Sequence, residues 1–92
     1  MAMKTYNEQE TNDKLQELRG WVYEDNGIEK AYEFENFVEA FSFMTKVAML
    51  SEKANHHPEL FNVYNSVNVR YTTHDAGGIT DKDFKLAAQI DN

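Results

Sequence analysis

The sequence contains no cysteine, and its 92 residues include only one proline and four glycines. Without cysteine the chain can form neither a disulfide nor a thiolate nucleophile, and cysteine-ligated zinc or iron–sulfur sites are excluded. It also lacks an apolar run of about 18 residues, the length that a membrane-spanning helix requires. No apolar segment follows Met1–Lys4 as it would in a signal peptide. We therefore expect a cytoplasmic protein that is neither secreted nor membrane-spanning.

Basic residues are scarce as well. Nine lysines and arginines stand against 16 acidic residues, which gives a net charge of −7. Such a protein is repelled by phosphate backbones and anionic lipids, so we expect no direct nucleic-acid partner and no membrane partner. With 41% hydrophobic residues, the chain supports a single domain over residues 1–92. A core of this modest size makes oligomerisation a natural source of further stability. The polar residues 1–10 are expected to be frayed.

Hydrophobic periodicity predicts the order helix, two strands, helix, two strands, helix. The expected elements are a helix over 11–19, a hairpin over 21–34, a helix over 36–54, two strands within 60–73 that turn near Asn65, and a helix from 80. Two capping boxes support the longer helices, Asn36 with Glu39 and Thr80 with Asp83. This order predicts an α+β two-layer sandwich, in which helices cover one face of a four-stranded antiparallel sheet. The other face must be wet or must meet another subunit.

Apolar side chains follow the period of each predicted element. In the helix over 36–54 they form one broad stripe, which indicates core packing against the sheet rather than a cofactor site. Its members are Phe37, Phe41, Met44, Val47 and Ala48. In the strands, alternation predicts a buried face with Val63, Val67, Val69 and Tyr71.

All three histidines, His56, His57 and His74, lie within 19 residues of one another. Glu52 precedes His56 by four residues, a spacing that on a helix brings carboxylate and imidazole to one face and would orient the ring. If Asn65 and Ser66 form a two-residue turn, antiparallel pairing places His57 opposite His74. The sequence therefore predicts one site that contains all three imidazoles.

The residues alone leave three interpretations of this site open. Three imidazoles could bind zinc, copper or iron, although the adjacent His56 and His57 point in different directions on a regular backbone. Alternatively, His56 and His57 could cap the helix end, with His74 an ordinary strand-end residue. Acid–base chemistry is the third interpretation, because imidazole titrates near neutral pH and both donates and accepts protons.

Several segments of the chain closely resemble the pterin-4a-carbinolamine dehydratase family. The resemblance rests on Glu52–Glu59 with its Asn-His-His-Pro, on Asn62–Asn65, and on Thr72–Thr80 with its Thr-His-Asp. Gly20-Trp21 and Phe41–Ala48 also look like family landmarks, so the likeness extends over nearly the whole chain. The combination of these motifs at these spacings is far more specific than any one of them, and it favours acid–base chemistry.

The resemblance implies the reaction and the residues that carry it. The enzyme would dehydrate a 4a-hydroxytetrahydropterin to quinonoid dihydropterin and water, as in tetrahydrobiopterin recycling, with no metal and no cofactor. The catalytic residues implied by the family are His56, His57, His74 and Glu52. Those implied to line the pterin are Asn55, His56, His57, Thr72, Thr73, His74 and Asp75. We assign His56, oriented by Glu52, as the principal acid, His74 as a second proton-transfer group, and His57 as a binding group. Asp83 is a helix cap and a further catalytic candidate.

The family resemblance also implies partners. Members are typically dimers or tetramers, and vertebrate members serve as the dimerisation cofactor of a homeodomain transcription factor. A homodimer or homotetramer is therefore expected. The alternative function is a non-enzymatic coactivator that binds a partner helix, which would place the protein in the nucleus too. The chain departs from many relatives at Leu60, where they have an aromatic residue, and from some at Asn55, where they have aspartate.

Overall fold

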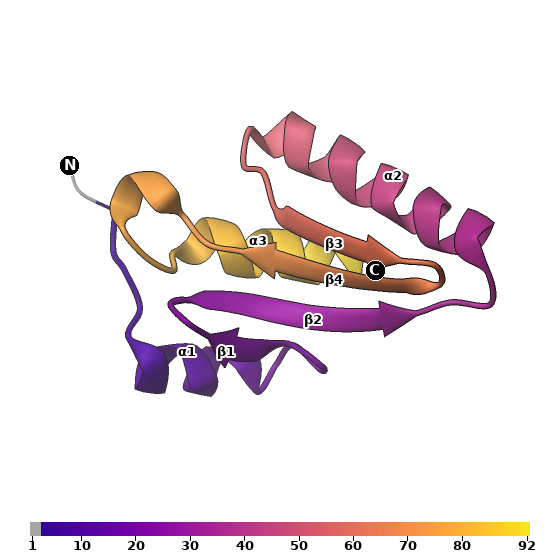
Figure 1. Cartoon of the computed structure of the whole chain (residues 1–92). Helices are drawn as coiled ribbons and strands as arrows, with labels where there is room; N and C mark the ends of the chain where they lie inside the picture. Colours follow the sequence, from indigo (N-terminus) through magenta and orange to yellow (C-terminus); the bar gives the residue numbers. More distant parts are fainter. Residues whose placement is uncertain (1–2) are drawn as a thin grey trace.

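The computed structural model describes residues 3–92 and contains three α-helices and four strands in that range. The elements are α1 (Glu8–Leu15), β1 (Val22–Glu24), β2 (Gly27–Glu33), α2 (Phe37–Ala54), β3 (Glu59–Val63), β4 (Ser66–Tyr71), the short 3₁₀ helix η1 (His74–Ala76) and α3 (Asp81–Ile90). The strands form one antiparallel sheet in the order β1-β2-β4-β3 (Figure 1). This confirms the predicted α+β class and element order. No helix within residues 3–92 is long and apolar enough to cross a membrane.

The N-terminal segment is more ordered than predicted. Helix α1 begins at Glu8 rather than near residue 11, because Asn7 and Glu10 form a capping box that its polar sequence concealed. Tyr6 adds a bridge to Ile79, its backbone N–H lying 2.8 Å from the Ile79 carbonyl oxygen. The expectation that residues 1–10 are frayed is therefore wrong from Tyr6 onward, and the first two residues lie outside the described range.

Both predicted caps of the longer helices are present, but one differs in detail. At α3, Thr80 and Asp83 satisfy each other's backbone N–H groups, as a capping box requires. At α2, the Asn36 side chain accepts from the Glu39 backbone N–H at 2.9 Å. The Glu39 carboxylate instead accepts from the N–H of Glu35, so the reciprocal half of that predicted box is wrong.

The hairpin of β3 and β4 turns one residue earlier than predicted. Tyr64 and Asn65 form the connection, and Val63 pairs with Ser66. Asn65 is fixed on the neighbouring chain segment, since it exchanges a backbone hydrogen bond and a side-chain amide contact with Phe34. Facing pairs are consequently shifted by two residues, and Val63, which pairs with Ser66, lies on the opposite face from Val67, Val69 and Tyr71.

The core lies between the helices and one face of the sheet. Four strand residues, Ile28, Val67, Val69 and Tyr71, are almost completely buried. They pack with buried residues of the helices and of the loop before β1, namely Ala40, Val47, Phe84, Leu86, Ala87, Ile90 and Trp21. The predicted alternation in β4 is thereby confirmed, whereas Val63 at the end of β3 is exposed.

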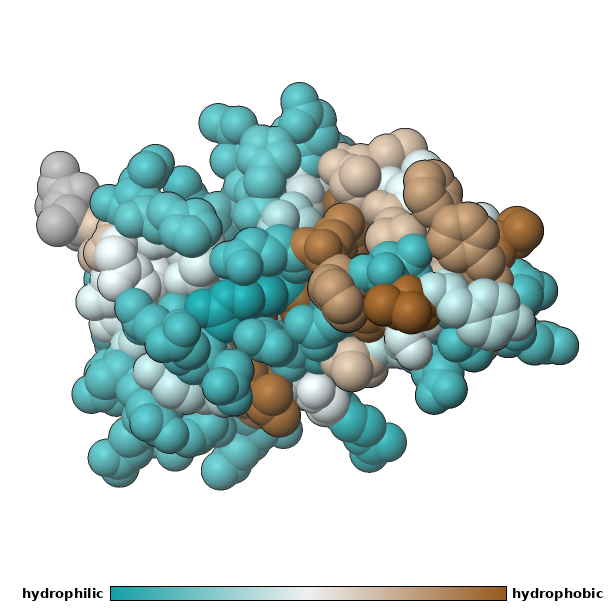
Figure 2. Space-filling view, in the orientation of Figure 1, coloured by the Kyte–Doolittle hydropathy of each residue, from teal (hydrophilic) through white to brown (hydrophobic). Residues whose placement is uncertain are grey.

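Much of the predicted core stripe of α2 faces solvent. Phe37 and Phe41 are 47% and 55% exposed, because the sheet covers only the part of the helix around Ala40 and Val47. Figure 2 shows hydrophobic side chains gathered over α2 and the adjoining strands. We call the following set the α2–β3 apolar surface: Phe37, Val38, Phe41, Met49 and Leu60. The exposed Phe61 of β3 lies on the other face of the sheet, beside Asn68.

Asp91 ties the C-terminal end of α3 to the sheet. Its carboxylate accepts hydrogen bonds from Trp21 Nε1 and Lys30 Nζ, each at 2.9 Å, and from the Tyr32 hydroxyl. Partial burial alone would raise the pKa of Asp91. The hydrogen bonds from Tyr32, Lys30 and Trp21, together with the charge of Lys30, outweigh burial and hold the pKa below its usual range.

We expect Asp91→Asn to lower the free energy of unfolding by about 1 to 2 kcal/mol at pH 7, because it weakens hydrogen bonds to a charged acceptor. A carboxyl group whose pKa is lowered by folding stabilises the fold above its unfolded pKa of about 4 and loses that contribution as pH falls further. The difference in the free energy of unfolding between wild type and Asp91→Asn should therefore shrink as the pH falls from 5 to 3. Thermal unfolding followed by circular dichroism measures it, with the exposed Asp13→Asn as control. An unchanged gap across that range would contradict the electrostatic origin.

Candidate active site

The C-terminal end of α2 sets the positions of two of the three histidines. Asn55 adopts the left-handed conformation, with φ of 51°. Its backbone N–H bonds to the carbonyl of Glu52, and the N–H of His56 bonds to the carbonyl of Ser51. This is the Schellman arrangement, with asparagine in the place that glycine most often takes. Asn55 thus ends the helix and turns the chain, so His56 and His57 lie beyond the last helical turn.

His56 is directed inward and is 9% exposed. Its ring lies nearly parallel to that of Tyr71, with centroids 5.9 Å apart and 14° between the ring planes. Its Nε2 atom lies 2.5 Å from Oδ1 of Asp83, at the start of α3. Burial raises the pKa of Tyr71, the hydrogen bond with Ser51 lowers it in part, and the charge of Asp83 raises it again. The phenol beside His56 is consequently a neutral packing partner near pH 7.

Asp83 is completely buried and connects several parts of the site. Oδ1 faces His56, while Oδ2 accepts from the Thr73 hydroxyl and from the Thr80 backbone N–H, both at 2.9 Å. The hydroxyls of Thr73 and Thr80 are 2.7 Å apart. Because Thr73 donates its proton to Asp83, Thr80 is the donor of that second bond. One carboxylate therefore joins the end of α2, the segment after β4 and the first turn of α3.

This arrangement determines which nitrogen of His56 is available. An ionised carboxylate only accepts hydrogen bonds, so Nε2 carries a proton and donates it to Asp83. Within residues 3–92, no hydrogen bond to Nδ1 of His56 is found. Nδ1 is then an acceptor in the neutral ring and a donor in the charged ring. A histidine held in this way can accept a proton from a ligand or deliver one to it.

The structure corrects the predicted partner of Glu52. Oε1 of Glu52 lies 2.8 Å from Nε2 of His57, not of His56. The reason is the left-handed turn at Asn55, which takes His56 off the helix and brings His57 back toward the last turn. Both side chains of the pair are exposed, by 58% for His57 and 80% for Glu52, so the contact contributes little to stability.

His74 opens η1 and is 76% exposed. Its Nε2 atom is 3.9 Å from a carboxylate oxygen of Glu59, which in turn lies 3.5 Å from Nε of Arg70. His57 does not face His74 across the hairpin as predicted, because the observed register, if extended beyond Glu59, would place Thr72 there. Glu59, two residues after His57, nevertheless links the two histidine-bearing segments.

The remaining predicted residues belong to the loop that carries His74. The Thr72 hydroxyl donates to the carbonyl of Asn26, and the Asn26 side chain donates to the carbonyl of Gly77. The β1–β2 turn therefore fixes both ends of the loop, a role that sequence reasoning missed. Asp75 is exposed on η1.

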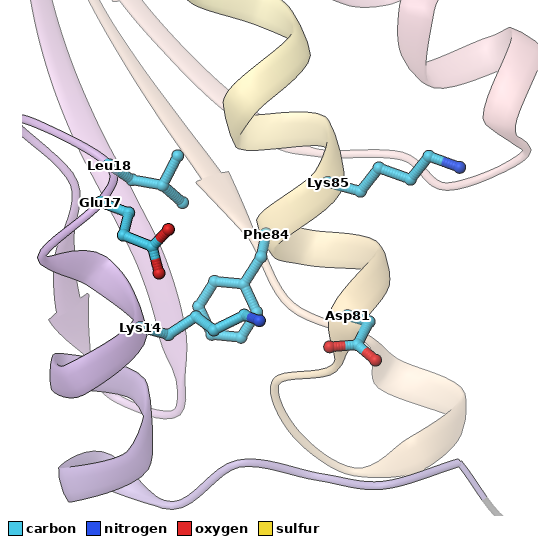
Figure 3. Close-up of a pocket in the computed structure, with 6 residues that line it drawn as sticks. All are labelled: Lys14, Glu17, Leu18, Asp81, Phe84 and Lys85. Atoms are coloured by element: carbon cyan, nitrogen blue, oxygen red, sulfur yellow. The ribbon is translucent and has the colours of Figure 1, made fainter.

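Two cavities border this region. One, of about 450 Å³, lies between α2 and α3 and is lined by Leu50, Lys53, Ala54, His56, Lys82, Lys85, Leu86 and Gln89. Its volume falls in the range of small-molecule sites. A second, of about 330 Å³, lies on the α1 side of α3, with Phe84 and Lys14 facing it (Figure 3). Of these two, only the first contains a predicted site residue, His56; Glu52 lines a separate groove along α2, together with Phe41 and Leu60.

Metal binding is poorly supported by these positions. Among residues 3–92, no three His, Asp or Glu side chains are placed so that they could hold one metal ion. The turn at Asn55 separates the two adjacent imidazoles, since one contacts α3 and the other contacts α2.

Sequence reasoning missed two contributors to the site and gave a third only as a further candidate. Tyr71 and Thr80 were predicted as a core residue and a helix cap, and nothing local indicated their contacts with His56 and Thr73. Asp83 was a candidate, and its position as the third residue of α3 was the signal, because a capping carboxylate has one oxygen left for another donor.

The fold and this arrangement define a small α+β protein with a histidine and aspartate site at the junction of α2, η1 and α3. A family model described as pterin 4 alpha carbinolamine dehydratase matches residues 4–92, and the chain belongs to this family. A protein of Sinorhizobium fredii, named "Putative pterin-4-alpha-carbinolamine dehydratase", is 57% identical over 81 residues, covering 86% of this chain and 77% of the relative. One of Christiangramia forsetii with the same name is 44% identical over 90 residues, covering 98% and 93%.

A solved structure supports the fold. The Brucella melitensis protein described as a transcriptional coactivator/pterin dehydratase superposes with a TM-score of 0.89 at 39% identity, covering 96% of each chain. The family resemblance and the predicted fold are therefore confirmed.

Proposed function

We propose that this protein dehydrates 4a-hydroxytetrahydropterins to quinonoid dihydropterins in the cytoplasm, as a step of tetrahydropterin recycling. The observation that carries the proposal is His56, buried against Tyr71, bonded through Nε2 to Asp83, and open to a cavity. Membership of the dehydratase family and the names of the relatives support it.

The reaction requires two proton transfers and no change in redox state. The bond between C4a and its hydroxyl breaks, the hydroxyl leaves as water with an added proton, and the ring nitrogen N5 loses its proton as a double bond forms to C4a. His56 is assigned the protonation of the leaving hydroxyl from Nδ1, because its other nitrogen is held by Asp83. His74 is assigned the second transfer and His57 the binding of the pterin.

The orientation of His56 is reassigned from Glu52 to Asp83. Asp83 has no exposed surface and its Oδ1 lies 2.5 Å from Nε2 of His56, whereas Glu52 is largely in water and contacts His57. Glu52 then orients His57, and Asn55 acts mainly by shaping the turn that precedes both rings.

The dehydration assay tests the proposal directly. A 4a-hydroxytetrahydropterin is generated in solution, and its loss is followed by ultraviolet absorbance with and without the protein. A first-order rate well above the spontaneous one, proportional to protein concentration and abolished by heat denaturation, is expected. A rate equal to the spontaneous one at micromolar protein would reject the enzymatic function.

We further propose that the α2–β3 apolar surface is covered by a second copy of the chain. Strand β3 is an edge strand with only β4 as neighbour, so its outer edge has unpaired backbone groups. The surface next to it includes a groove of about 780 Å³ with Phe41, Met49 and Leu60 among its lining residues. Exposed apolar area of this extent in one place is typical of an interface. Two copies meeting here would pair strands and bury both surfaces.

We expect Phe61→Glu to weaken self-association by about 30-fold or more, because it places a charge on the edge strand whose pairing joins the two copies. Phe61 is 68% exposed in the single chain, so the fold itself should be unaffected. Sedimentation equilibrium measures the assembly. Val22→Glu is the matched control, since Val22 is 56% exposed on the opposite edge strand, β1. Equal masses for Phe61→Glu and wild type at all concentrations would place the interface elsewhere.

The alternative function is a coactivator whose α2 binds a helix of a transcription factor. The exposed apolar face of α2 favours it, as does the name of the solved Brucella relative. Under this alternative, His56 and His74 variants would retain partner binding, and the wild type would show no dehydration.

A further inference from the structure

We infer that the pterin bound by this protein carries a negatively charged side chain, held in the cavity between α2 and α3 by Lys53, Lys82 and Lys85. This inference rests on the proposed function, since it assigns the substrate class of the same site. Three of the nine basic residues of the chain line this one cavity, and no acidic residue lines it.

The three lysines are free to bind a ligand. None of them forms a salt bridge or a side-chain hydrogen bond with any residue in the range 3–92. Other basic side chains are engaged, for example Lys30 with Asp91 and Arg70 with Glu29. In a protein of net charge −7, a local excess of positive charge is needed to hold an anion against the overall repulsion.

The cavity places these charges next to the proposed chemistry. His56 is one of its lining residues, and Lys82 directly precedes Asp83, the partner of His56. Leu50, Ala54 and Leu86 supply an apolar wall. A flat ring system bound at His56 would therefore extend a substituent toward ammonium groups on α3, and a phosphate or carboxylate there would gain charge-assisted hydrogen bonds.

Binding of two unreactive pterins tests the inference without turnover. By isothermal titration calorimetry, 6-hydroxymethylpterin phosphate should bind about tenfold more tightly than uncharged 6-hydroxymethylpterin, and the difference should shrink as salt is raised. In the variant Lys82→Gln/Lys85→Gln the ratio should fall to about two. The matched control Lys4→Gln/Lys14→Gln makes the same change in net charge away from the cavity and should keep the wild-type ratio.

Pterin-6-carboxylate serves as a second anionic probe and distinguishes the two sources of charge. Tighter binding than that of uncharged 6-hydroxymethylpterin, by the phosphate, by the carboxylate or by both, supports the inference and identifies the anionic group that is recognised. Equal affinity for all three pterins, or a gain that survives the loss of Lys82 and Lys85, overturns it. If the anionic preference is present but no dehydration occurs, the proposed function fails while the charged cavity stands.

Discussion

His56→Gln should lower kcat for dehydration by about 10²- to 10⁴-fold, the usual contribution of a positioned acid or base. Glutamine keeps an amide N–H that can reach Asp83, so the buried carboxylate retains its donor. The variant loses the second ring nitrogen, Nδ1, which is an acceptor in the neutral ring and a donor in the charged ring. We therefore expect a large fall in kcat with a small change in KM and in melting temperature. Steady-state kinetics and thermal unfolding of the same preparation measure both.

His57→Gln is the matched comparison for that variant. His57 is the sequence neighbour of His56, but it is exposed and bonded to the exposed Glu52. Its replacement should raise KM by a few fold and leave kcat within about tenfold of wild type, since it acts in binding. Full activity of His56→Gln, or a larger kcat loss in His57→Gln, would show that the two roles are assigned the wrong way round.

Asp83→Asn should cause the second large loss, again by about 10²-fold or more in kcat. The amide presents NH₂ to one of the three donors that now surround the carboxylate. If it faces His56, the ring accepts at Nε2 and carries its proton on Nδ1, and the charged ring that delivers a proton as the acid has lost its acceptor at Nε2. A wrong tautomer of this kind is costly in other histidine and aspartate pairs.

Two readouts separate this positioning role from a merely structural one. Loss of a buried hydrogen bond should lower the free energy of unfolding by about 1 to 3 kcal/mol. The tautomer change should also alter the Nδ1 and Nε2 signals of His56 in ¹⁵N NMR spectra, which stability alone would not do. Asp81→Asn is the control from the same helical turn, where an exposed side chain accepts a bond from Tyr6. Wild-type kcat in Asp83→Asn would remove Asp83 from the site.

Local sequence signals predicted the fold well because each of them depends on a few neighbouring residues. Thr80 with Asp83 marked the start of α3, and the alternation of Val67, Val69 and Tyr71 marked the buried face of β4. The partners of the histidines were not predictable in this way. Asp83 lies 27 residues from His56, and their contact depends on how α2 and α3 pack.

Two of the wrong expectations, one at the site and one in the core, have equally specific causes. Spacing suggested Glu52 for His56, but the helical rule fails once a residue such as Asn55 leaves the helical conformation. Similarly, the stripe with Phe37 and Phe41 shows which residues share a face and is silent on what covers that face. In the described residues, part of this helix face is exposed to solvent, and that exposed part is the basis of the proposed dimer surface.

The left-handed residue before the two histidines has a chemical consequence. Because the backbone reverses at a single position, adjacent imidazoles enter opposite environments, one sheltered from water and paired with a buried carboxylate, the other wet and paired with an exposed one. Two adjacent histidines with identical side chains therefore differ in their solvation. Evolution can then adjust the sheltered ring through its aspartate and the wet ring through its glutamate without disturbing the other.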